Sequence, residues 1–93
     1  GASVIEFSVD GTYAADFSTT GFIPVTNNAI DLGSTSKRWR NVYTTDLQLS
    51  NEGKTNDVDG TWGNYTIQEG ESDLFLINNR NGKKYKFNLT EVL

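Results

Sequence analysis

One expected strand, residues 73–78 with the sequence DLFLIN, is apolar on both of its faces. Side chains alternate between the two faces of a β-strand, so Leu74 and Leu76 lie on one face. Phe75 and Ile77 lie on the other. Both faces of such a strand have to be covered. Helical patterns are nearly absent from the sequence, so we expect either the N-terminal hairpin or a neighbouring copy of the chain to cover Phe75 and Ile77.

The apolar content of the chain is small for this purpose. Only 35% of the 93 residues are hydrophobic, and no cysteine is present to form a disulfide. A chain of this size buries roughly 60–65% of its unfolded surface even when it is well packed. We therefore expect a single small all-β domain over residues 1–93 that is completed by association with other chains. Because the sequence lacks methionine, we also expect it to be a fragment of a longer protein.

Composition also restricts function. Without cysteine or histidine, the chain has no ligands for the usual zinc, iron–sulfur or haem centres and no Ser-His or Cys-His nucleophile pair. A net charge of −4 disfavours nucleic acid as a partner, because binding duplexes requires surplus positive charge. No apolar stretch approaches the roughly 20 residues of a membrane span. We expect no enzyme activity, no cofactor, no nucleic-acid partner and no membrane insertion.

The first part of the chain predicts a β-hairpin. Residues 4–17 form two alternating runs on either side of an Asp-Gly pair. Their apolar sets share one face only if the connection contains an odd number of residues. We therefore predict a three-residue loop over residues 9–11, with Gly11 at the left-handed bulge position and Phe7 opposite Tyr13.

The remaining sequence divides into further short elements. We place an N-terminal β unit at residues 1–50, and it includes a short helical turn near 34–40, capped by a hydroxyl, and a strand over 46–50. Residues 51–60 contain one apolar side chain and predict a loop. Residues 61–93 predict an antiparallel three-stranded meander.

The meander contains the strongest hairpin signal in the chain, an Asn-Gly pair at residues 81–82. The three expected strands span residues 61–68, 73–78 and 83–89. A two-residue type I′ turn at the Asn-Gly pair places Leu76 opposite Phe87 and Asn78 opposite Tyr85. One face of this hairpin is then apolar except for Asn78.

Two acidic clusters suggest chemistry, and each has a simpler explanation. Asp57 and Asp59 precede a glycine, as oxygen ligands do in calcium loops, but the spacing of an EF-hand fails at two ligand positions. A solvated turn explains the pair, and whether it binds an ion stays open. Glu69, Glu71 and Asp73 could serve a glycosidase, but an acidic turn in water accounts for them as well. We predict no catalytic or metal-binding residue.

The aromatic residues offer two further hypotheses. Trp62 stands among small residues, and it is either a ring that stacks on a glycan or a plug at a subunit boundary. The candidate trimer interface consists of Trp39, Trp62, Phe75 and Ile77. The candidate glycan contacts are Trp62, Tyr65 and Tyr85.

Residues 28–43, NAIDLGSTSKRWRNVY, resemble the DLGS–RW–VY element of tail fibres and tail spikes of bacterial viruses. The stretch from Val58 to Val92, VDGTWGNYTIQEGESDLFLINNRNGKKYKFNLTEV, resembles the ends of tail-fibre-like virion proteins, particularly those of contractile-tailed viruses of cyanobacteria. Together these stretches cover 51 of the 93 residues, just over half of the chain. The resemblance implies a β-rich, intertwined homotrimer that is located in the virion. No self-cleaving chaperone domain follows Tyr43, so autocleavage is not implied.

Two functions from different classes follow. The first is a structural and adsorption element of a viral tail fibre, a trimeric fibre end that contacts the host surface, with a host-surface glycan as its candidate partner. The alternative is a monomeric carbohydrate-binding module that uses exposed aromatic side chains. A hydrolase based on the acidic turn has little support.

Overall fold

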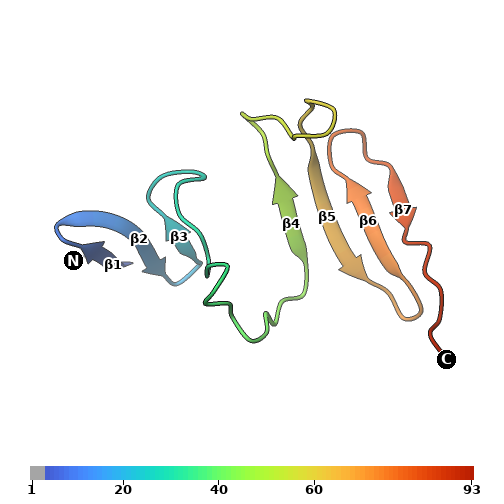
Figure 1. Ribbon diagram of the computed structural model, residues 1–93, viewed down its shortest axis with the longest axis horizontal. Coiled ribbons are helices and arrows are strands. Elements are labelled where there is room, and N and C mark those ends of the chain that lie inside the picture. The colour runs from blue at the N-terminus through green and yellow to red at the C-terminus, as the bar shows by residue number, and fades with distance from the viewer. Residues whose placement is uncertain (1–3) are drawn as a thin grey trace. The chain divides into compact units, whose positions relative to one another are not determined.

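The computed structural model describes residues 4–93, and these residues form antiparallel β structure with no helix. The all-β prediction is therefore confirmed. Two compact units, residues 1–40 and 41–93, divide the chain, and each contains one sheet (Figure 1). The strands are β1 (Val4–Val9), β2 (Thr12–Ser18), β3 (Phe22–Pro24), β4 (Leu47–Ser50), β5 (Asn64–Glu69), β6 (Leu74–Asn78) and β7 (Lys84–Lys86).

The N-terminal hairpin forms as predicted, but its turn is shorter. Strands β1 and β2 are joined by two residues, Asp10 and Gly11, with φ of 51° and 77°. Positive φ at both central positions is typical of the type I′ turn that an Asp-Gly pair favours. The predicted three-residue loop and the pairing of Phe7 with Tyr13 are therefore wrong.

A β-bulge supplies the one additional residue that was expected in the loop and that keeps the apolar side chains of both strands on one face. The register shifts between Phe7 and Ser8, so that Phe7 lies opposite Ala15 while Ser8 lies opposite Tyr13. One extra residue in β2 brings the later part of the strand back into phase with β1. The apolar side chains of the two strands consequently share a face, although Tyr13 is not opposite an apolar residue.

Three aromatic rings lie on this face of the β1–β2–β3 sheet. The ring centroid of Phe22 is 5.4 Å from that of Phe7 and 5.9 Å from that of Phe17. Ala15 is the one buried hydrophobic residue of the described chain, while Phe17 and Phe22 remain 51% and 58% exposed. The sheet therefore gathers its apolar side chains without enclosing them.

The predicted helical turn near residues 34–40 does not form, and the backbone there consists of bends. The Ser34 hydroxyl accepts a hydrogen bond from the Lys37 amide at 3.0 Å, so the predicted cap is present without a helix behind it. The Ser34 amide donates to the Lys37 carbonyl at 3.0 Å, which closes a local turn instead. Gly33 has a φ of +85° and lies against the ring of Trp39.

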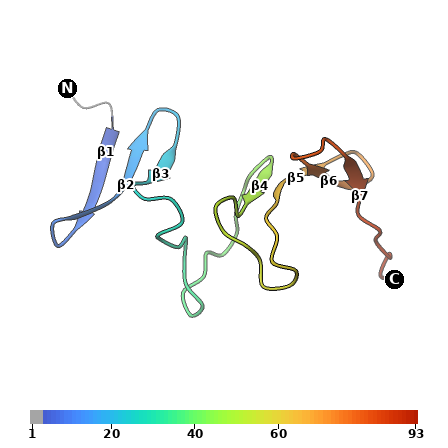
Figure 2. The ribbon, with the colours of Figure 1, turned by 90° about the horizontal axis from the view of Figure 1, so that it is seen from above.

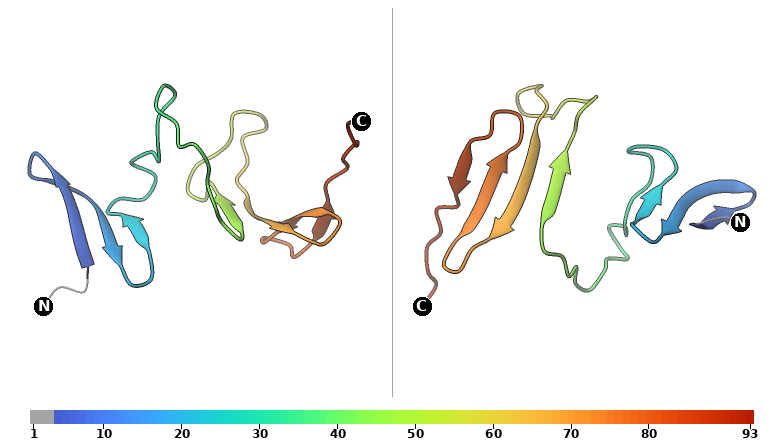
Figure 3. Two further views of the ribbon diagram at one scale, coloured as in Figure 1. Left: turned by 90° about the horizontal axis from the view of Figure 1, so that it is seen from below. Right: turned by 180° about the vertical axis from the view of Figure 1, so that it is seen from behind.

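The second sheet has the order β4-β5-β6-β7, and every neighbouring pair is antiparallel (Figures 1 and 3). Its last three strands are the predicted meander. The strand expected over residues 46–50 exists as β4, but it pairs with β5 and not with the N-terminal β unit. Apolar side chains of β4 alternate in phase with those of β5, since Leu47 lies opposite Ile67 and Leu49 opposite Tyr65.

The β6–β7 hairpin differs from the prediction in its loop. Five residues, 79–83, connect the strands, and only Gly82 among them has positive φ. A two-residue type I′ turn would require positive φ at Asn81 as well. Leu76 consequently lies opposite Tyr85 and not Phe87. The register moves by two residues, so every side chain keeps its predicted face.

Alternation assigns the side chains of the second sheet to two faces with different character. The apolar face consists of Leu47, Leu49, Tyr65, Ile67, Leu74, Leu76, Tyr85 and Phe87, with Asn78, Glu69 and Lys83. The polar face carries Gln48, Thr66, Gln68, Lys84 and Lys86, and it also holds Phe75 and Ile77. Figure 2 views the strands from above, at right angles to the view of Figure 1. Within residues 4–93, Thr66 is the one buried polar side chain.

The conformation of the first turn can be tested with Gly11. A Cβ atom at this position meets nothing within 4 Å, so a substitution acts through the positive φ alone. We expect Gly11→Ala to lower the free energy of unfolding by about 1 kcal/mol in urea titrations. Gly11→Asn should cost less, because asparagine adopts the left-handed conformation more readily. Equal stability of the glycine and alanine forms would contradict the type I′ turn.

Candidate functional site

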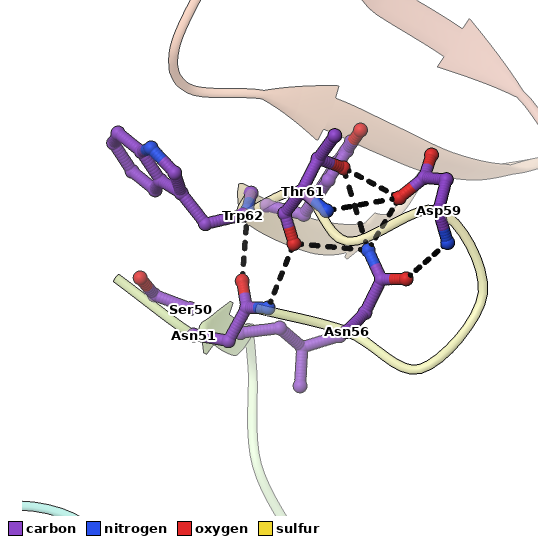
Figure 4. A pocket seen from close by; sticks show the side chains of 9 residues that line it. Ser50, Asn51, Asn56, Asp59, Thr61 and Trp62 are labelled. Carbon is purple, nitrogen blue, oxygen red and sulfur yellow. Dashed lines mark hydrogen bonds between the residues drawn. The ribbon is translucent and has the colours of Figure 1, made fainter. Parts of the chain in front are cut away.

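The segment between β4 and β5 is a closed loop held by polar side chains. At its base, the Asn51 side-chain oxygen accepts a hydrogen bond from the Gly63 amide at 2.8 Å (Figure 4). The Asn51 amide nitrogen Nδ2 lies 3.4 Å from the Thr61 carbonyl, to which it donates. These bonds join the end of β4 to the start of β5 and hold the intervening residues as one unit.

Asn56 organises the tip of the same loop. Its Oδ1 accepts hydrogen bonds from the amides of Val58 and Asp59 at 2.8 and 2.9 Å. Its Nδ2 donates to the Asp59 carboxylate at 2.8 Å and to the Thr61 carbonyl at 3.0 Å. Asparagine favours turns of this kind because its short side chain reaches the amides two and three residues ahead.

Asp59 closes the loop by accepting three hydrogen bonds on a single oxygen. The donors to Oδ1 are the Thr61 hydroxyl at 2.7 Å, the Asn56 amide at 2.8 Å and the Thr61 backbone amide at 3.1 Å. The Thr61 hydroxyl, followed by the Asn56 side chain, holds the pKa of Asp59 below its usual value. The Asp59 carboxylate therefore holds the loop closed, and none of its three hydrogen bonds comes from Asp57.

Trp62 follows this loop and is fixed by Arg80. The guanidinium carbon of Arg80 lies 3.7 Å from the centroid of the Trp62 ring, and its Nη1 donates to the Trp62 carbonyl at 3.0 Å. The Arg80 amide donates in turn to the Asn78 side chain at 3.0 Å. The β6–β7 loop thereby presents a cation to the tryptophan face, which the electrostatics of the indole ring favour.

Two shallow, open pockets adjoin Trp62. The first is lined by Leu49, Ser50, Asn51, Asn56, Asp59, Thr61, Trp62, Gly63 and Tyr65. The second shares its central residues with the first and is completed by Asn78, Arg80 and Asn81. An aromatic ring beside amide and hydroxyl groups can bind a polar ligand with one apolar surface, such as a sugar ring. Most of these amides, however, already make hydrogen bonds within the loop.

The structure brings together two of the three candidate glycan contacts. Trp62 and Tyr65 line the same pockets. Tyr85 lies on the apolar face opposite Leu76 and lines neither of them. The candidate contacts therefore do not form one platform.

The candidate interface residues fall in different places. Trp39 belongs to the first unit and is 64% exposed. Phe75 and Ile77 lie on the polar face, opposite Lys86 and Lys84. The ring of Phe75 covers Gly70, where an added Cβ would lie 2.5 Å from it, so this ring packs on the β5–β6 turn.

The acidic residues Glu69, Glu71 and Asp73 lie exposed at the β5–β6 turn. This turn is at the end of the sheet opposite to Trp62 (Figure 1). Within the described residues 4–93, no group of three or more acidic, histidine or cysteine side chains is arranged to hold a metal ion.

Arg80, Asn51 and Asn56 were not among the predicted site residues. Arg80 is 18 residues from Trp62, and only the pairing of β5 with β6 brings the two together. The Asn56–Asp59–Thr61 spacing is a signal that could have been used, since an Asx residue followed by a glycine predicts a closed turn.

Comparisons with family models, curated proteins and solved structures gave no match to this chain. The tail-fibre resemblance therefore stays a hypothesis. Residues 4–93 contain no helix with the length and apolar character needed to cross a bilayer.

The pKa of Asp59 gives a pH-dependent prediction. Because the folded pKa is lowered, the carboxylate stabilises the loop fully above its ordinary value of 3.8, and this contribution is lost as the pH falls through the lowered pKa. We expect the carboxyl carbon of Asp59 to titrate below that value in NMR spectra. Thr61→Val removes the hydroxyl donor and should raise the midpoint. An unchanged midpoint would contradict the role of Thr61.

The contact between Arg80 and Trp62 can be tested by fluorescence quenching. In a Trp39→Phe background, Trp62 is the only tryptophan. We expect Arg80→Gln to increase acrylamide quenching of Trp62 and to destabilise the chain by about 1 kcal/mol, the magnitude of an exposed cation–π contact. Arg80→Lys keeps the charge and should have a smaller effect. Identical quenching in all three forms would show that Arg80 does not fix the ring.

Proposed function

We propose that this chain is a structural segment of a viral tail fibre or related virion appendage, which becomes fully folded when three copies assemble. The observation that carries the proposal is the exposure of apolar side chains in a single copy. Twenty-one large apolar or aromatic side chains are each at least 36% exposed, and Ala15 is the only buried hydrophobic residue within the described range. Folded chains normally bury most side chains of this kind.

The accessible surface area supports the same proposal. The chain exposes 8643 Å². Two separate compact bodies of 40 and 53 residues would expose roughly 6,400 Å² in total. The excess is therefore roughly 2,200 Å² when each unit is taken as a compact body of its own.

The size of this excess fits contacts with two neighbours. A standard interface buries about 800 Å² on each partner. Each chain of a cyclic trimer makes two such contacts, one with each neighbour, whereas each chain of a twofold dimer makes one. The excess area is sufficient for two contacts, and the number three itself comes from the tail-fibre resemblance.

Sedimentation equilibrium tests the proposal directly. At micromolar concentration we expect a species with three times the chain mass of 10.3 kDa. The physical reason is that removing the exposed apolar surface from water favours association. A species of 10.3 kDa under these conditions would contradict the proposal.

Glycan binding at Trp62 is the second candidate function. The observation that favours it is that Arg80 holds the ring beside open pockets lined by Tyr65 and several amides. Rings fixed in this way lose little conformational entropy when a ligand binds. The same site is compatible with a fibre that contacts host-surface glycans.

A glycan array distinguishes this candidate from a purely structural role. We expect binding, if it is mediated here, to be abolished by Trp62→Ala and retained by Trp39→Ala, because Trp39 lines neither of the two pockets. Binding that survives Trp62→Ala would exclude this site as the glycan contact.

A further inference from the structure

The apolar face of the second sheet is uncovered. Its central side chains, Ile67 and Leu76, are only half-buried. Leu47 and Leu49 on the edge strand are each 46% exposed, and Tyr85 is 47% exposed. The structure describes every residue of the second unit, and no segment of that unit encloses this face. Eight apolar side chains thus form a contiguous exposed surface over four strands.

The polar face of the same sheet is suited to contact with water. The Thr66 hydroxyl donates to the Gln48 side chain at 2.6 Å and accepts from the Asn79 amide at 2.9 Å. The Gln68 amide donates to the Asp46 carboxylate at 3.2 Å. The first of these bonds joins β5 to β4, and the other two join β5 to residues next to the ends of β4 and β6. They satisfy the polar groups of the face without a second layer.

Two lysines complete the polar face, and their charge distinguishes it from the apolar face. Lys84 and Lys86 are exposed and lie opposite Ile77 and Phe75. The lysine stems can cover these two side chains while their ammonium groups stay in water. Burying the polar face against a partner would remove both charges from water, which is costly unless each finds an opposite charge.

We infer that copies of this chain meet through the apolar face of the β4–β7 sheet, and not through the face that carries Phe75 and Ile77. This inference rests on the proposed assembly. The occupant is a second copy of the chain, because the whole-chain excess of roughly 2,200 Å² exceeds the roughly 800 Å² per partner that a standard interface requires.

The distribution of charge favours the same occupant. Glu69 and Lys83 are the two charged residues that alternation places on the apolar face, and they lie at its opposite ends. Identical faces can therefore approach each other without burying an unpaired charge, while Glu69 and Lys83 stay at the rim. A partner recognised by charge would find no complementary group in the centre of this surface.

The inference separates the residues of the two earlier hypotheses. Tyr65 and Tyr85 both lie on the apolar face and are covered on assembly, so neither is available to a glycan. Trp62 and Arg80 lie in loops at one end of the sheet and remain outside the contact (Figure 1). Any ligand site of the assembled protein is therefore expected around the 51–63 loop.

Thiol labelling tests the face assignment with a matched pair. Leu76 and Ile77 are neighbours in β6, both are half-buried, and they point to opposite faces. The chain has no cysteine, so Leu76→Cys and Ile77→Cys each introduce one thiol, and both remove the same side-chain volume because leucine and isoleucine are isomers. In the assembled protein we expect a maleimide to label the Leu76→Cys variant at least about tenfold more slowly. Labelling in denaturant should remove the difference.

The outcomes distinguish the assignment from the proposed function. Slow labelling of Leu76→Cys in a species of three chain masses supports the inference. Equal labelling of the two variants, or slower labelling of Ile77→Cys, in that same species overturns the face assignment and leaves the assembly intact. A wild-type chain that sediments at 10.3 kDa overturns the proposed function. A charge-introducing pair, Leu76→Lys and Ile77→Lys, gives an independent check, and only the first is expected to dissociate the assembly.

Discussion

The shortage of buried apolar surface is the constraint on which the rest of this structure depends. Hydrophobic burial supplies most of the driving force for folding, and it has to exceed the conformational entropy lost by every ordered residue. Here two sheets form with good hydrogen-bond geometry, yet each leaves its large apolar side chains in contact with water. A chain of this kind gains most of the missing burial when other copies cover those side chains.

Local polar bonding explains how the chain is ordered with so little core. Asx turns, the donors to Asp59 and the cross-strand bonds of Thr66 satisfy backbone and side-chain groups without a second layer. Such bonds contribute modestly to net stability, because they replace bonds to water. They do, however, determine which conformation is adopted, so that the apolar face of the second sheet is presented on a regular four-stranded surface. In the proposed assembly, burial of apolar surface between copies then stabilises the conformation that the local hydrogen bonds already favour.

Much of the fold was predictable because period-2 alternation and Asx-Gly turns are local signals. Alternation in residues 73–78 correctly placed Leu76 and Ile77 on opposite faces of the sheet. The predicted register with the last strand was wrong by two residues, because Leu76 lies opposite Tyr85, but a shift of two residues leaves every side chain on its predicted face. Local signals failed where strand pairing decided the outcome. The bulge after Phe7 compensates for a turn whose length the pattern alone could not determine. Likewise, Arg80 contacts Trp62 only because β5 pairs with β6. The sequence therefore predicted Trp62 as a site residue but not Arg80.

Thermal unfolding as a function of protein concentration tests the central claim most directly. If folding and assembly are coupled, dilution by about 100-fold should lower the melting temperature, because dissociation and unfolding then occur together. The account predicts this decrease, and it predicts a smaller one for a variant whose apolar face is already disrupted. A melting temperature that is independent of concentration, with a single cooperative transition in a 10.3 kDa species, would show that one copy folds alone and would contradict the account.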